Sequence, residues 1–407
     1  MDRLFLQVVK LILVVFVLAG CALPPRLTGK PGRLAQFERK HGPLSPGEII
    51  EIEHDRLVVV EALLDQLANR RIIYVGETHN DLDHHDVQLE ILERLYAKDS
   101  QLVIGMEMFE RTFQGVLDRW TSGAIERGTL VRESEWYSRW KFDFFYYEKI
   151  LNFARENRIK ILALNAQREL VERVGDFGIQ ALSPDERAMI ASIDTSDVHH
   201  RRYIQRVFKT HQKSPGKTFE NFYEAQCVWD DTMAETISDF VTSQEGEDQR
   251  IIVFSGGGHI AYKFGIPERV YKRTGLSYAT VLPSSLKQIR EMSHEDEIQD
   301  SLPIADFIWV TESSVREKAR LGILGEDSLA DEKGVVIRRV IKGSSAEEAG
   351  IQPGDKILSI DGESVHDMVD LRLVLSRKSL GSTSQVVFLR DDKREETEVT
   401  FLKKTFH

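Results

Sequence analysis

The sequence predicts a three-layer α/β/α domain with a mainly parallel sheet and a helical insertion, followed by a small β-rich domain. Two patterns carry this prediction. Over residues 55–311, short runs of Ile, Val and Leu alternate with amphipathic segments, as expected for buried parallel strands separated by helices. Residues 312–407 instead alternate apolar and polar positions between Gly and Asp turns, which is typical of antiparallel strands.

The composition limits the classes of protein that the chain can represent. Hydrophobic residues make up 42% of the 407 residues, which is enough for folded cores and excludes a mainly disordered chain. The formal net charge is -11, and nucleic-acid binding needs a cationic face. We therefore expect no nucleic-acid partner.

The N-terminal residues predict an envelope protein with a lipid anchor. The apolar run Leu11–Leu18 is short for a membrane-spanning helix and suits a signal peptide over residues 1–20. The sequence Leu-Ala-Gly before Cys21 resembles a bacterial lipobox, in which the cysteine is acylated and becomes the mature N-terminus. Position 22 is Ala rather than Asp, which in the sorting rule for bacterial lipoproteins favours anchoring in the outer membrane. Residues 21–54 are interpreted as a tether between the anchor and the folded body.

The elements of the larger domain follow from its apolar runs. The six candidate strands are 71–75, 102–106, 160–164, 251–254, 279–282 and 307–310. Helices are expected over residues 83–98 and 148–156, and a capping box begins another at Ser183. The interval 169–243 shows no convincing strand and is interpreted as the helical insertion.

Polar residues follow four of these strands at the same relative position. Glu77 and His79 follow the first strand, Glu107 the second, Asn165 the third, and His259 the fourth after three glycines. Because the carboxyl ends of parallel strands meet at one edge of a sheet, we expect these side chains to lie together. Alone, each would more simply be a cap or a turn residue.

Two imidazoles and two carboxylates form a ligand set suited to a divalent transition metal. The expected ligands are Glu77, His79, Glu107 and His259. Asn165 and Asp231 are expected to form hydrogen bonds to these ligands from behind. The alternative for Asp231 and its neighbour Asp230 is to cap a helix. A phosphate cradle at the glycines is a weaker interpretation, because no Lys-Ser or Lys-Thr follows them.

Two further segments have structural interpretations. Residues 136–147 hold eight aromatic side chains, which fit core packing better than a face for a flat ligand. His199, His200, Arg201 and Arg202 are interpreted as a solvated helical face.

The C-terminal domain resembles a PDZ domain. The segment GSSAEEAGIQPGDKILSIDGESV, residues 343–365, is similar to the PDZ signature of bacterial periplasmic proteins. The resemblance implies that the backbone at Leu321, Gly322, Ile323 and Leu324 holds the carboxylate of a partner's C-terminal peptide. Helix 369–376 would form the opposite wall of the groove. The alternative is a PDZ fold used only for packing.

The larger domain resembles the ChaN-like haem-binding lipoprotein family, which belongs with the Tiki and erythromycin-esterase-like proteins. The motifs are GETHND, GMEMF, ALNAQREL, WDDTMAETI, FSGGGHIAY and GIPERV. For ChaN the resemblance implies haem as cofactor, a tyrosine as its ligand, a role in iron acquisition and a homodimer that sandwiches haem. Tyr74 and Tyr262 lie nearest the motifs, although packing is the simpler role for both.

For Tiki, the resemblance implies instead a metal-dependent protease with the same four ligands. Glu77 or Glu107 would then act as general base on a metal-bound water. The sequence thus leaves two hypotheses open, a haem-binding protein and a metal-dependent hydrolase, and we favour the first on family grounds. A scaffold with an inactive α/β domain is a third.

Overall fold

The computed structural model describes residues 33–210, 218–292, 303–328 and 333–403. The chain divides into two compact units. The first contains residues 1–124 and 150–314, and the second contains residues 125–149 and 315–407. The predicted signal peptide and Cys21 lie outside the described residues. No helix within the described ranges is both long and apolar enough to cross a membrane.

The first unit is built on an eight-stranded sheet with the order β2-β1-β8-β7-β3-β6-β4-β5. All neighbours from β8 to β5 are parallel, whereas β1 pairs antiparallel with β2 and with β8. The strands are β1 (Ile49–Glu51), β2 (Arg56–Val58), β3 (Ile72–Glu77), β4 (Leu102–Glu110), β5 (Ile161–Asn165), β6 (Arg250–Gly256), β7 (Tyr278–Ser285) and β8 (Phe307–Thr311). The predicted α/β fold with a mainly parallel sheet is confirmed.

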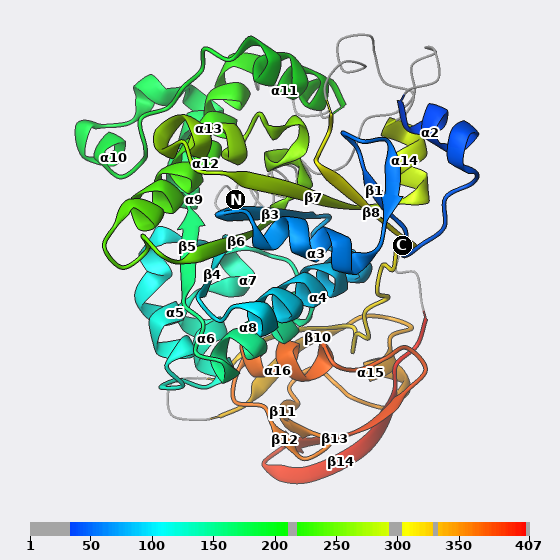
Figure 1. Cartoon of the computed structure of the whole chain (residues 1–407). Helices are drawn as coiled ribbons and strands as arrows, with labels where there is room; N and C mark the ends of the chain where they lie inside the picture. The colour runs from blue at the N-terminus through cyan, green and yellow to red at the C-terminus, as the bar shows by residue number, and fades with distance from the viewer. Residues whose placement is uncertain (1–32, 211–217, 293–302, 329–332, 404–407) are drawn as a thin grey trace. The chain divides into compact units, whose positions relative to one another are not determined.

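Helices cover both faces of this sheet. In Figure 1, α3 and α4 lie below the sheet, and α11, α12 and α13 lie above it. Met233 and Ile237 of α12 belong to the same buried cluster as Val253 of β6. The helices of the first unit are α2 (Arg33–His41), α3 (Val60–Ala68), α4 (Leu82–Lys98), α5 (Gln114–Thr121), α9 (Arg168–Phe177), α10 (Pro184–Ala188), α11 (Val198–Thr210), α12 (Phe219–Thr242), α13 (Ile266–Thr274) and α14 (Leu286–Met292).

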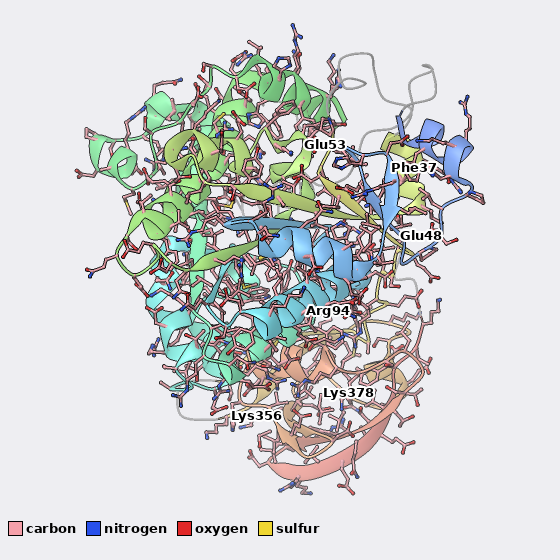
Figure 2. All side chains as sticks on the ribbon, in the orientation of Figure 1. Phe37, Glu48, Glu53, Arg94, Lys356 and Lys378 are labelled. Carbon is pink, nitrogen blue, oxygen red and sulfur yellow. The ribbon has the colours of Figure 1, made fainter. Side chains whose placement is uncertain are left out.

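Residues 33–54 differ from the tether that the sequence predicts for them. They contain α2 and β1, and β1 extends the sheet beyond β8. Phe37, labelled in Figure 2, is buried in one cluster with Ile50 and Ile308. The apolar residues of this segment are therefore part of the core of the first unit. Charged residues stand between them in the sequence, so no apolar run marks them.

The second unit is a β-rich fold with an antiparallel sheet in the order β14-β13-β11-β10-β9. Its strands are β9 (Ile323–Asp327), β10 (Val335–Val340), β11 (Lys356–Ile360), β12 (Glu363–Ser364), β13 (Thr383–Arg390) and β14 (Lys393–Thr400). Its helices α15 (Ser345–Glu348) and α16 (Met368–Leu375) cover an apolar core that includes Ile337, Leu371 and Phe388. The small β-rich domain is thus confirmed.

The second unit also contains a segment from the middle of the larger domain's sequence. Residues 125–149 carry α6 (Arg127–Glu133), α7 (Trp136–Arg139) and the first turns of α8 (Phe145–Glu156). Within them Trp136, Phe144 and Tyr147 are buried, and the rings of Phe144 and Tyr147 each make a T-shaped contact with Trp136. The aromatic segment therefore has the packing role that the sequence favours, although its place in the second unit was not predicted.

Candidate functional site

The polar side chains predicted at the strand ends lie at one edge of the sheet. Glu77 ends β3, Asn165 ends β5, and His259 stands in the short helix η4 (Gly257–His259) directly after β6. Glu107 lies within β4, where the pairing with β5 is interrupted by a register shift. Together with His79, these side chains are between 3 and 9% exposed. The parallel topology thus brings distant residues together as expected.

His259 is held between two carboxylates. Its Nδ1 lies 2.6 Å from Asp230 Oδ1, and its Nε2 lies 3.4 Å from Glu107 Oε1. Burial alone would lower the pKa of the imidazole, but Glu107 and Asp230 raise the pKa of His259 well above its ordinary value. Both carboxylates therefore favour the protonated form of His259, and its Nδ1 is placed to donate to Asp230.

The pKa values of both carboxylates beside His259 are lowered. Burial alone would raise the pKa of each, but the charge of His259 lowers the pKa of Glu107 and that of Asp230. The backbone N–H of Gly256 also donates to Glu107 Oε2 at 2.6 Å. The arrangement thus stabilises a positive charge on the buried imidazole with a carboxylate on each side.

A second carboxylate–imidazole pair adjoins the first. His79 Nδ1 lies 2.7 Å from Glu77 Oε1, and His85 Nδ1 lies 3.4 Å from Glu77 Oε2. His79 also contributes to the lowered pKa of Glu107, so the two pairs lie close enough to interact. We name Glu77, His79, Glu107, Asp230 and His259 the strand-end cluster.

The side chains expected behind the ligands are placed differently from the prediction. The Asn165 amide donates to the backbone carbonyl of Glu107 at 3.0 Å and not to its carboxylate. Asp231 faces Arg269 at 3.1 Å and Arg273 at 2.9 Å, while its neighbour Asp230 contacts His259. Successive residues of a helix point about 100° apart, so only one of the two aspartates in α12 can face the cluster.

The sequence interpretation missed His200 and Arg269. His200 is 1% exposed, and its Nε2 lies 3.3 Å from Asp230 Oδ2. The Arg269 guanidinium lies 3.3 Å from the other nitrogen of that imidazole. The solvated face predicted for residues 199–202 is therefore wrong for His200. Its spacing from Ile204 and Val207, which are buried on the same face of α11, was the available signal.

The strand-end cluster has part of what a metal site requires. His79 and His259 each have Nδ1 against a carboxylate, an arrangement common for imidazoles that ligate a metal through Nε2. Within the described ranges, however, no three His, Cys, Asp or Glu side chains are arranged to hold an ion. The donor types fit a transition metal, and the side chains would have to turn to bind it.

Tyr262 and Phe264, which follow His259 in the chain and are partly exposed, form an aromatic group with the exposed His199 and the buried Tyr203 of α11. The Tyr262 ring stacks on Phe264 at 5.7 Å and 24°, and the His199 ring stacks on Phe264 at 6.1 Å and 21°. Tyr203 meets the edge of Tyr262 at 5.6 Å. We name His199, Tyr203, Tyr262 and Phe264 the aromatic platform.

The backbone beneath the platform is strained. Tyr262 and Lys263 have φ values of 57° and 66°, a left-handed conformation that costs a residue with a side chain on the order of 1 kcal/mol or more. Strain of this kind persists where the surrounding structure fixes a side chain in position.

Tyr74 does not qualify as a ligand. Its side chain is fully buried in the core cluster above β3, and burial raises the pKa of Tyr74 well above its ordinary value. A phenolate that binds iron has to lose its proton, which this environment opposes. Tyr262 is the one of the two motif-flanking tyrosines that is partly exposed.

The predicted carboxylate-binding loop has the required backbone. The carbonyls of Leu321 and Gly322 accept from the N–H groups of Ala346 and Ile341, and Gly322 has a φ of 77°. Among the described residues, nothing accepts from the N–H of Leu321 or Gly322, although both residues are buried. Ile323 and Leu324 begin β9, whose outer edge has no strand partner in the described residues.

Family comparison agrees with the architecture of the first unit. The family model described as "Haem-binding uptake, Tiki superfamily, ChaN" matches residues 63–270, which is more than half of the chain. The chain belongs to this ChaN family. A second model, described as a PDZ domain, matches residues 316–401. We therefore name the two units the ChaN-like unit and the PDZ unit.

The individual relatives show the same division. ChaN of Campylobacter jejuni, solved with cofacial haem, has a TM-score of 0.51 and 19% identity and covers 65% of this chain and 98% of its own. RETICULATA-RELATED 5 of Arabidopsis thaliana is 26% identical over 65% of this chain, and the putative serine protease HhoA of Synechocystis is 34% identical over 15%. The matches span 36% and 16% of those two proteins.

Proposed function

We propose that this chain is a lipid-anchored protein of the bacterial envelope, at the outer membrane, that binds haem through its ChaN-like unit. The observation that carries the proposal is membership of the ChaN family, together with a fold shared with a structure solved with cofacial haem. The PDZ unit binds the C-terminal peptide of a partner, and the lipobox at Cys21 supplies the anchor. Such a protein serves haem or iron acquisition.

The aromatic platform is the proposed haem site. Stacked, partly exposed rings suit a flat macrocycle, and a tyrosine phenolate is an established ligand of haem iron. Arg202 follows on α11, is exposed, and forms no ion pair within the described residues. Its guanidinium would neutralise a haem propionate, while Tyr262 would supply the oxygen ligand.

Titration of the purified protein with haemin tests this assignment. We expect a saturable Soret shift for the unaltered chain and a loss of at least tenfold in affinity for Tyr262→Phe. Tyr74→Phe is the matched control, because its hydroxyl has no hydrogen-bond partner in the core. Sedimentation of the haem-loaded protein reports whether two copies share the ligand. A missing Soret shift at stoichiometric haemin would refute haem binding. Equal haemin affinities of Tyr262→Phe and the unaltered chain would refute only the assignment of Tyr262 as the ligand.

A metal-dependent hydrolase is the second candidate function. The observation that favours it is the pairing of both His79 and His259 with a carboxylate at Nδ1. His79, His259 and Glu107 would hold the ion, and Glu77 would stay hydrogen-bonded to His79. The metal would supply an acidic bound water, and a glutamate of the cluster would take its proton.

Metal analysis of the purified protein separates this function from the first. The hydrolase requires about one zinc, iron or manganese ion per chain, lost in His259→Ala and kept in His54→Ala, which alters an exposed surface histidine. Metal contents that do not differ between the two variants would count against a metal at the strand-end cluster.

A further inference from the structure

Helix α16 of the PDZ unit is covered on two sides. Leu371 and Val374 face the core of the PDZ unit. Leu373 is also buried, with 2% exposure, but it lies outside that core cluster. The other side of α16 adjoins α6, and Figure 1 shows the two helices next to each other. We name residues 125–149, which belong to the PDZ unit but come from within the ChaN sequence, the insert.

An arginine of the insert forms hydrogen bonds at the N-terminal end of α16. Arg132 Nε donates to Asp367 Oδ2 at 2.6 Å, and its terminal nitrogen donates to Asp370 Oδ1 at 2.5 Å. Asp367 is itself the N-cap of α16 and accepts from the N–H of Asp370 at 2.9 Å. A guanidinium that binds two carboxylates at once fixes both position and direction, which a single ion pair does not.

The insert also holds the C-terminal end of α16. Glu148 Oε1 accepts from Arg127 of the insert at 3.0 Å and from Arg377, just beyond α16, at 2.5 Å. Arg316 packs over the Phe145 ring at 4.0 Å and donates to the carbonyl of Lys378 at 2.7 Å, a residue labelled in Figure 2. Both ends of the helix are therefore tied to residues 125–149.

The position of α16 determines the space beside β9. The N–H of Met368 donates to Asp327 Oδ1 at 2.6 Å, which joins the start of α16 to the end of β9. A Cβ at Gly325 would lie 3.3 Å from Met368 Sδ, so the helix and the strand approach closely at this point. A peptide that adds to the outer edge of β9 has to fit between that edge and α16.

We propose that the insert is a working part of the peptide-binding module, in which Arg132 positions α16 and thereby sets the affinity for a C-terminal peptide. This inference rests on the proposed peptide binding of the PDZ unit. It assigns a residue of the ChaN sequence to recognition of the protein partner. The module is accordingly residues 125–149 with 315–403.

The test uses the full chain and a fluorescent peptide. The probe is the tightest binder from a library of decapeptides with free C-terminal carboxylates, and its amidated form is the negative control. We expect Arg132→Ala to weaken binding about tenfold and to speed amide hydrogen exchange in α16. The peptide affinity of Arg132→Lys should lie between those of Arg132→Ala and the unaltered chain, because an ammonium ion cannot bridge both aspartates. The matched control is Arg173→Ala, which removes an exposed ion pair with Glu186 in the ChaN-like unit.

The outcomes separate the inference from the function on which it rests. If no peptide binds the unaltered chain more tightly than its amidated form, peptide binding by the PDZ unit is refuted. If peptide binds and Arg132→Ala retains the affinity of the unaltered chain, the role of the insert is refuted. Should Arg132→Ala fail to fold, the peptide affinity of Glu148→Gln provides the test. A weaker affinity supports the inference, and an unchanged affinity overturns it.

Discussion

At the scale of single residues, the charge of His259 follows from its neighbours. Asp230 and Glu107 both lie within 3.4 Å of the ring, and the Arg269 guanidinium contacts His200 behind Asp230. Both carboxylates favour the protonated imidazole, in which each ring nitrogen carries a proton. A metal or a substrate that uses Nε2 would have to displace its proton.

Replacing Asp230 by Asn should return the pKa of His259 toward its ordinary range. The carboxylate of Asp230 is one of the two charges that raise it, so its removal makes the protonated ring less stable. The imidazole carbon shifts in NMR, followed against pH, measure the change. Asp231→Asn makes the same substitution one residue further along α12, where the side chain faces Arg269 and Arg273. A His259 titration that is the same in both variants would contradict the assignment.

The residues of the strand-end cluster were largely predictable, and those behind it were not. Glu77, His79, Glu107 and His259 follow apolar runs whose parallel pairing fixes where they meet. Whether Asp230 or Asp231 faces His259 depends on the rotation of α12, which the motif WDDTMAET does not determine. His200 comes from an insertion whose packing the sequence leaves open.

At the scale of elements, the backbone has little room for a side chain near the end of β3. Gly76 pairs with Ser255 of β6, and η4 follows β6 directly. A Cβ at Gly76 would lie 2.5 Å from Leu282 Cδ2 and 3.2 Å from the Cα of Gly257. This close approach lets His259 turn toward the cluster immediately after the strand.

We expect Gly76→Ala to destabilise the ChaN-like unit by about 1–3 kcal/mol, because the added methyl overpacks the junction. Urea unfolding followed by circular dichroism measures this. Gly115→Ala is the control: it lies in α5 with open space around it, and alanine there should stabilise by roughly 0.5–1 kcal/mol. An equal change in the free energy of unfolding in the two variants would show that the junction is not tightly packed.

The contact between the insert and α16 should give the PDZ unit an acid-sensitive component of stability. Burial alone would raise the pKa of Glu148, but Arg377 and Arg127 bring it below its ordinary value of 4.5. The folded state then binds a proton less readily than the unfolded state. The stabilisation is complete above pH 4.5 and is lost as the pH falls through the lowered pKa.

Glu148→Gln removes this titration. We expect the variant to be less stable than the unaltered chain at pH 7 by on the order of 1–2 kcal/mol, and the difference to shrink at about pH 3.5. Urea midpoints at the two pH values provide the test. A difference that stays constant between them would show that Glu148 is not ionised by its arginine partners.

Elements with a strong periodic pattern were predictable from the sequence. The six apolar runs became β3 to β8, and residues 356–360 became β11. In contrast, β1 and β9 are short and interrupted by charged or glycine residues, so no pattern reveals them. The insert is helical by local sequence, but nothing local indicates that its partner is α16, far along the chain.

At the scale of the whole molecule, the two units are formed from alternating segments of the chain. The PDZ unit needs residues 125–149 from within the ChaN sequence and residues after 315. Trp136, Leu130 and Val131 of the insert are almost fully buried in the intact chain. The PDZ unit is therefore not confined to the residues after the predicted boundary near residue 312.

A chain that ends at residue 314 should lose protection of the insert. Without the C-terminal residues Arg132 loses Asp367 and Asp370, Glu148 loses Arg377, and the buried aromatic residues gain exposure. Limited proteolysis with mass spectrometry should find new cleavage sites within residues 125–149. Cleavage elsewhere in the ChaN-like unit serves as the internal reference. An insert that stays as resistant as in the full chain would contradict the division into units.

We propose that the ChaN-like unit binds haem at the aromatic platform. Anomalous diffraction at the iron edge, from crystals of the full chain grown with haemin, tests it most directly. We predict an iron peak within bonding distance of the Tyr262 hydroxyl. An iron peak at the strand-end cluster or anywhere else on the ChaN-like unit, or crystals without bound iron, would contradict the claim.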